Sequence, residues 1–63
     1  MIKAILQKGK ITYRFEQDGL EYWVIGEEEK YRGMTKVIMS ELVDKETGNK
    51  FYKSLIEKGY KEI

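Results

Sequence analysis

A chain of 63 residues has room for one small domain, and a composition of 41% hydrophobic and 37% charged residues is typical of a folded, soluble chain. The absence of cysteine and histidine excludes disulfides, metal sites built from thiolates or imidazoles, and catalysis by either side chain. Twelve basic and eleven acidic residues give a net charge of +1, which excludes a strong overall attraction to nucleic acid or anionic membrane.

The sequence carries no signal for export or membrane insertion. No stretch approaches the roughly 18 apolar residues that a membrane span requires, and residues 1–10 lack the long apolar core of a signal peptide. We therefore expect a cytoplasmic protein with no membrane segment. A chain this short buries only about 60% of the surface that its unfolded form exposes, so we expect a homo-oligomer to supplement its modest stability.

The first 26 residues predict a three-stranded antiparallel meander, with strands at about 2–7, 11–17 and 20–25. Apolar residues alternate with polar ones in each segment, which indicates a strand with one buried face. The residues of the predicted buried face are Ile2, Ala4, Leu6, Ile11, Tyr13, Phe15, Leu20, Tyr22 and Val24.

Two glycine-containing dipeptides, Lys8-Gly9 and Asp18-Gly19, predict the hairpin turns of this meander. Asp-Gly between alternating segments favours a type I′ turn, which needs positive φ at both central positions. Both turns place the alternating apolar residues on one face, and a slip of one residue would destroy that agreement. The expected cross-strand pairs are Gln17–Leu20, Phe15–Tyr22, Tyr13–Val24, Leu6–Ile11, Ala4–Tyr13 and Ile2–Phe15.

The C-terminal part predicts a helix over about 50–58, with Asn49 as its N-cap and Gly59 as the residue after its end. The side chains of Phe51, Tyr52, Leu55 and Ile56 share one face of this helix, which we expect to cover the buried face of the sheet. The tail, residues 60–63, either frays or adds a short edge strand.

The middle segment, about 35–44, fits either a helix or a strand. The helix is preferred, because "SELVDK" contains good helix formers and Gly48 suits a break between two helices. The segment "GEEEKYRG", residues 26–33, is then a charged connector. The predicted fold is a single α+β domain: a three-stranded antiparallel β-meander followed by one or two C-terminal helices packed on one face.

Trp23 is out of phase with the neighbouring aromatic residues, so it belongs to the second face of the sheet. The expected register surrounds it with two cations and two isoleucines. Three interpretations arise: a structural role with Arg14 stacked on the indole under a covering segment, a protein contact, or stacking of unpaired nucleic-acid bases. The candidate interaction face consists of Lys3, Ile5, Arg14, Trp23 and Ile25.

No constellation of residues predicts catalysis. The acidic pair Glu16 and Glu21 lies beside an exposed turn, where solvent keeps both carboxylates ionised. We therefore expect no cofactor, no metal and no enzymatic activity. The expected function is a small interaction module of the adaptor, inhibitor or regulator type, which binds a protein partner or itself. The alternative is a nucleic-acid-binding module with Trp23, Arg14 and Lys3 at the bases; its candidate phosphate contacts are Lys50, Lys53 and Lys58.

Overall fold

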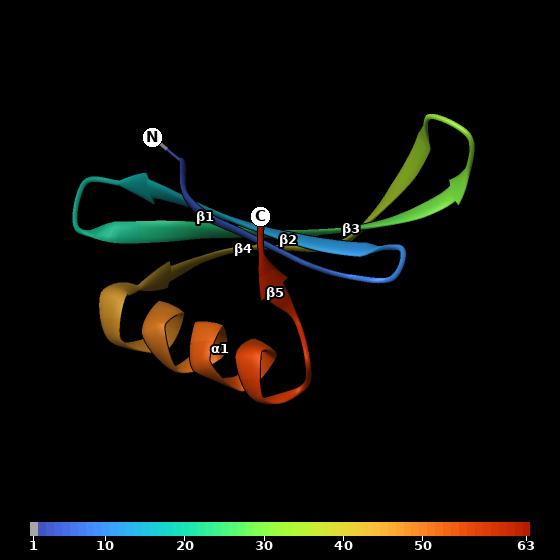
Figure 1. The fold of residues 1–63 in the computed structure, drawn as a ribbon. Coiled ribbons are helices and arrows are strands. Elements are labelled where there is room, and N and C mark those ends of the chain that lie inside the picture. The colour runs from blue at the N-terminus through green and yellow to red at the C-terminus, as the bar shows by residue number, and fades with distance from the viewer. Residues whose placement is uncertain (1) are drawn as a thin grey trace.

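An antiparallel sheet of five strands packs one face against one helix in this structure, a computed structural model that describes residues 2–63. The strand order is β4-β3-β2-β1-β5, so the first four strands form a meander and the fifth joins it beside β1. Figure 1 shows the helix below the sheet. The elements are β1 (Ile2–Lys8), β2 (Ile11–Asp18), β3 (Glu21–Tyr31), β4 (Met34–Asp44), α1 (Lys45–Glu57) and β5 (Lys61–Glu62).

The α+β class and the antiparallel meander are confirmed, but the sheet is larger than the three strands expected. Residues 34–44, for which a helix was preferred, form β4, and most of the expected connector at 26–33 extends β3. β4 pairs with β3 along its whole length, from Glu21 opposite Asp44 to Tyr31 opposite Met34. This long ladder overrides the helix propensity of the segment, because propensity is only a weak local preference.

Both N-terminal hairpins turn one residue later than expected. Gly9 and Gly19 have φ angles of 60° and 65°, and no residue other than glycine has a positive φ within residues 2–63. A type II′ turn needs positive φ only at its first central position, where these glycines lie. The expected type I′ turns would have forced Lys8 and Asp18 into the left-handed region, which lysine tolerates poorly.

The later turns shift the expected register by two residues. Phe15 pairs with Val24 instead of Tyr22, and Leu20 lies in the second turn, 92% exposed, instead of in a strand. The first hairpin shifts in the same way, with Ala4 opposite Phe15. Because side chains alternate with a period of two, a shift of two residues leaves the side chains of the regularly paired segments on the face that was predicted. Leu20, which leaves the strand, and Ile2, which lies beyond the irregularity in β1, are the exceptions.

The helix begins earlier than expected. Its N-cap is Asp44, whose Oδ1 accepts a hydrogen bond from the backbone N–H of Thr47 at 2.7 Å. Asn49, the expected cap, and Gly48, the expected break, both lie inside α1. Gly48 is buried, and a Cβ there would lie 3.2 Å from the ring of Tyr22. The glycine therefore lets the first turn of the helix approach the sheet closely.

The N-cap carboxylate makes the stability of the fold sensitive to acid. Hydrogen bonds from the side chain and backbone of Thr47 hold the pKa of Asp44 below its ordinary value of 3.8. A pKa lowered in the folded state contributes stability that is present above the unfolded value and lost as pH falls through the folded value. We expect the melting temperature of the wild type to fall more than that of Asp44→Asn between about pH 5 and pH 2.

The amide of the Asp44→Asn variant still accepts a cap hydrogen bond but does not titrate, so it is the matched control for that prediction. Melting followed by circular dichroism at several pH values measures the difference. Parallel pH profiles for the two proteins would show that the cap carboxylate contributes nothing to acid sensitivity.

The helix ends as the sequence predicts, with Gly59 at a φ of 100° directly after the C-cap residue. The N–H of Tyr60 donates to the carbonyl of Leu55 at 3.0 Å, and the N–H of Gly59 donates to that of Ile56 at 3.1 Å. These two bonds define a Schellman motif. The tail then adds β5 to the edge of β1, which confirms the edge-strand alternative for residues 60–63.

The core lies between α1 and the covered face of the sheet. Four apolar side chains are buried there: Leu6, Phe15, Val24 and Leu55. Aromatic rings surround them, with the Tyr13 ring edge-on to the ring of Phe51 at 5.3 Å and to that of Tyr60 at 5.5 Å between centroids. Of the expected helix face, Ile56 is 43% exposed and lies outside the core.

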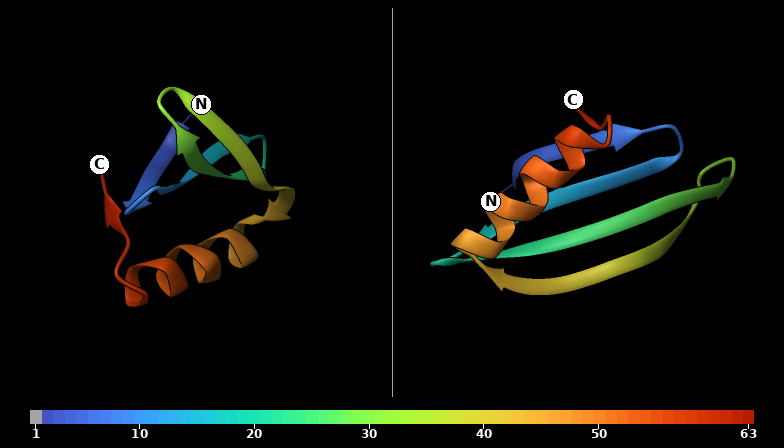
Figure 2. Two further views of the ribbon diagram at one scale, coloured as in Figure 1. Left: turned by 90° about the vertical axis from the view of Figure 1, so that its right-hand side faces the viewer. Right: turned by 90° about the horizontal axis from the view of Figure 1, so that it is seen from below.

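The sheet is bent, and its bend shapes the surface away from the helix. The pairing of β3 with β4 is irregular at two places, between Gly26 and Glu27 and between Glu29 and Tyr31. Such bulges bend strands and increase their twist. Figures 1 and 2 show the outer half of the β3–β4 hairpin rising from the sheet on the side opposite α1. Among residues 2–63, no helix is long and apolar enough to cross a membrane.

Candidate functional site

The sheet face away from α1 is called here the open face, since residues 2–63 place no second layer over it. Its cross-strand rows bring together most of the residues expected there. Ile5, Arg14 and Ile25 lie directly opposite one another on β1, β2 and β3. The next row consists of Glu16, Trp23 and Leu42, on β2, β3 and β4.

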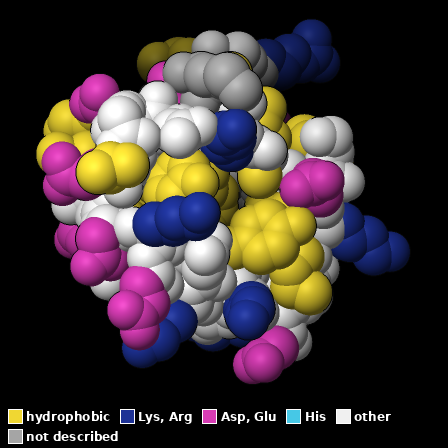
Figure 3. Space-filling model, turned by 90° about the vertical axis from the view of Figure 1, so that its left-hand side faces the viewer, with side chains coloured by type: hydrophobic (Ala, Val, Ile, Leu, Met, Phe, Trp, Pro, Cys, Tyr) yellow, Lys and Arg dark blue, Asp and Glu magenta, His cyan; other side chains and the backbone are white. Residues whose placement is uncertain are grey.

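Lys3 lies apart from the other four residues of the expected interaction face. The pairing of β1 with β2 is irregular between Ile2 and Ala4, which places Ile2 opposite Glu16 and removes Lys3 from the row. Lys3 instead lines a small cavity of about 80 Å³ with Phe15 and Tyr52, at the end of the core. Figure 3 views the molecule from this end, where hydrophobic side chains gather among charges of both signs.

Trp23 and Leu42 are opposite each other on the open face, and both are exposed, by 38% and 43%. The structural interpretation required residues 34–44 or the connector at 26–33 to fold across Trp23. Instead, β4 lies beside β3 in the sheet, and residues 26–31 extend β3. Leu42 was not predicted as part of this face, because residues 35–44 were interpreted as a helix. Only the pairing of this segment with β3 places Leu42 beside Trp23.

Arg14 does not stack on the indole but forms two ion pairs. Its Nε lies 2.6 Å from Oε2 of Glu16, and its Nη1 lies 3.4 Å from Oε1 of Glu27. All three side chains are about one-third exposed, so solvent weakens the pairs and their contribution to stability is small. Their main effect is to hold the guanidinium over the sheet and to neutralise its charge.

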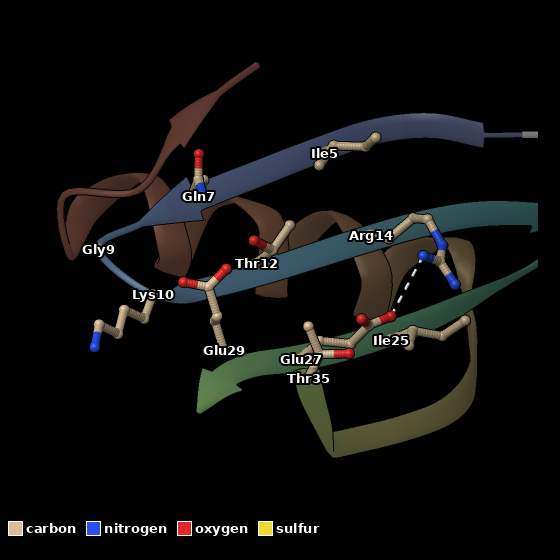
Figure 4. Close-up of a pocket in the computed structure, with 10 residues that line it drawn as sticks. All are labelled: Ile5, Gln7, Gly9, Lys10, Thr12, Arg14, Ile25, Glu27, Glu29 and Thr35. Carbon is tan, nitrogen blue, oxygen red and sulfur yellow. Dashed lines mark hydrogen bonds and ion pairs between the residues drawn. The ribbon is translucent and has the colours of Figure 1, made fainter. Parts of the chain in front are cut away.

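A hollow of about 230 Å³ lies on the open face between the two isoleucines and the raised β3–β4 hairpin. Figure 4 shows the side chains of Ile5, Arg14 and Ile25 on its floor, and the dashed line marks the contact between Arg14 and Glu27. Lys10 and Glu29 border its far end. The hollow is therefore a shallow depression with charges of both signs, which suits contact with a side chain better than enclosure of a small molecule.

The three lysines proposed as phosphate contacts lie on the opposite side of the sheet from Trp23. Lys50 and Lys53 border a shallow depression on the outer surface of α1, where Lys50 pairs with Glu46 at 3.4 Å. Lys58 is the C-cap residue, and its carbonyl accepts a hydrogen bond from Lys8 Nζ at 2.6 Å. The geometry thus separates the lysines of α1 from the aromatic residue with which they were grouped.

Within residues 2–63, acidic side chains form no cluster of three or more that could hold a metal ion. Comparison of the chain with models of protein families, with curated proteins and with solved structures finds no match. The chemistry of the open face is therefore the basis for a functional proposal.

Proposed function

We propose that this chain is a small non-enzymatic interaction module, of the adaptor, inhibitor or regulator type, which binds protein through the open face. The observation that carries the proposal is the exposed pair Trp23 and Leu42, on a sheet face over which the described residues place no second layer. Trp and Arg are enriched at the centres of protein interfaces, where apolar anchors are surrounded by a polar rim. Arg14 and its two carboxylates supply such a rim beside the indole.

Nucleic-acid binding has less support from the same surface. A protein that contacts phosphates does so with unpaired cations, and its affinity depends on the counterions that it releases. On the open face Arg14 already contacts Glu16 and Glu27, and Lys50, Lys53 and Lys58 belong to α1 on the other side. A single strand stacked on Trp23 would therefore approach carboxylates more closely than free cations.

Replacement of Trp23 by alanine tests the proposal. We expect Trp23→Ala to weaken binding of protein ligands by about 2 kcal/mol or more, because a central tryptophan commonly contributes that much to an interface. Ligands are first selected from a displayed peptide library on the immobilised wild-type chain, and their affinities are then measured for both proteins. The variant should still fold, with a lower melting temperature, because the indole is 38% exposed and lies outside the buried core.

Leu20→Ala is the matched control, because Leu20 is an exposed apolar residue in the β2–β3 turn, outside the open face. It should leave the affinities unchanged. Selected ligands that bind Trp23→Ala as tightly as the wild type would refute the open face as the site. Unfolding of Trp23→Ala would instead assign the indole to stability.

A further inference from the structure

The two edges of the sheet differ in how they are protected. At one edge, β5 pairs with β1 through Leu6 and Gln7. At the other edge, β4 is eleven residues long, and β3 is its one partner strand among residues 2–63. Figure 2 shows that α1 leaves the end of β4 and runs toward the opposite edge of the sheet. Within residues 2–63, no strand pairs with the outer edge of β4, which leaves a row of backbone groups available to another chain.

Natural proteins block such edges with proline, with charge or with a bulge. β4 contains no proline, and its bulge at Ile38 separates a regular segment, Met39–Asp44, from the raised hairpin. The regular segment carries the exposed side chain of Leu42 on the open face. It pairs with β3 without further irregularity, so it has the geometry of a strand that can accept a neighbour.

We propose that β4 of a second copy of this chain is the neighbour, paired antiparallel over Ser40–Asp44. A twofold axis perpendicular to a sheet requires one residue to lie opposite its own copy. An axis at Glu41 would oppose two carboxylates, which is destabilising. An axis at Leu42 opposes the two leucines, places Glu41 opposite Val43, and opposes no like charges. The charge pattern of the strand therefore excludes Glu41. Among the other residues, Leu42 is the centre that places the apolar side chain exposed on the open face opposite its own copy.

This arrangement rests on the proposed function, because the second copy pairs at the edge of β4 and enlarges the open face. The twofold axis keeps both open faces on the same side of a continuous sheet, so the row Glu16–Trp23–Leu42 continues into Leu42 and Trp23 of the second copy. Two small apolar patches thereby become one. A pair of five-residue strands buries less than the roughly 800 Å² per partner of a stable interface, so the dimer forms reversibly and depends on concentration.

A single introduced cysteine tests the pairing, because the natural chain has none. In an antiparallel pair, opposed residues have Cα atoms about 4.5–5.5 Å apart, which is within the range that a disulfide bridges. We expect Leu42→Cys to form a disulfide-linked dimer in a glutathione buffer about tenfold faster or more than Leu20→Cys, because paired thiols have a high effective concentration. Leu20→Cys reports random collisions, since Leu20 is exposed in the β2–β3 turn.

Hydrogen exchange of the wild-type chain supplies a readout without substitution. Amide protection within Ser40–Asp44 should rise with protein concentration, while protection in β2 stays constant. A dimer in sedimentation experiments with neither effect would overturn pairing at the β4 edge. A chain that stays monomeric at every concentration would overturn the second copy as partner, and the peptide-binding test with Trp23→Ala would still decide the proposed function.

Discussion

Replacement of Leu55 by alanine is expected to lower the free energy of unfolding by about 3 kcal/mol, because it leaves a cavity in a core that cannot readily collapse. Leu55 is only 2% exposed and is the one residue of α1 in the buried cluster with Leu6, Phe15 and Val24. A chain of 63 residues has a total stability of roughly 3 to 9 kcal/mol. The substitution therefore removes a large share of it.

The neighbouring residue on the same helix supplies the matched control. Ile56 is 43% exposed, so Ile56→Ala should cost less than about 1 kcal/mol. Urea denaturation followed by circular dichroism measures both variants. Equal losses for Leu55→Ala and Ile56→Ala would mean that α1 does not pack on the sheet through Leu55.

The first three strands could be predicted because their signals are local. Alternation identifies the face on which each side chain lies, and a register shift of two residues does not change that face. Trp23 was therefore assigned to the second face correctly, although its cross-strand partners were not. Lys3 was misplaced, because the irregularity between Ile2 and Ala4 interrupts the alternation, and no residue type in that segment marks such an irregularity.

β4 could not be recognised from alternation, because its bulge interrupts it. Even-numbered side chains lie on one face before the bulge and on the other face after it. Lys36 pairs with Glu28 before the bulge, and Met39 pairs with Gly26 after it. An even-numbered and an odd-numbered residue thus share one face, which a simple alternation excludes. Apolar residues on the two sides of a bulge then mimic the spacing of a helix. Only the pairing with β3, a contact between distant parts of the sequence, resolves the ambiguity.

The second half of β3 was missed for a different reason. Residues 27–31 belong to the raised hairpin, where most side chains are exposed on both faces. A strand without a buried face needs no apolar alternation, so "GEEEKY" resembles a charged loop. Because this hairpin was not recognised, only part of the open face could be predicted. Its residues on β2 and β3 follow from the alternation of side chains along each strand. Leu42 and the contact from Glu27 to Arg14 depend instead on the extended hairpin.

Gly26 illustrates how the structure reverses an expectation based on residue type. Glycine within a strand weakens it, so Gly→Ala at a compatible backbone conformation normally stabilises a protein by about 0.4–1 kcal/mol. Gly26 has no positive φ and meets that condition. However, a Cβ at this position would lie only 2.6 Å from Cε1 of Tyr13, its cross-strand partner. The ring of Tyr13 therefore occupies the space that a side chain at position 26 needs.

We expect Gly26→Ala to lower the free energy of unfolding by about 2 kcal/mol, as overpacking of a filled core does. The Tyr13 ring cannot move aside freely, because it packs edge-on against Phe51 and Tyr60. A double-mutant cycle provides the control: in a Tyr13→Ala background the same substitution should be neutral or stabilising, which gives a coupling energy between the two sites. Urea denaturation of the four proteins measures it. If Gly26→Ala lowers the free energy of unfolding equally in both backgrounds, the loss comes from the backbone of β3 and not from the ring. The packing of Tyr13 would then not be the reason that position 26 requires glycine.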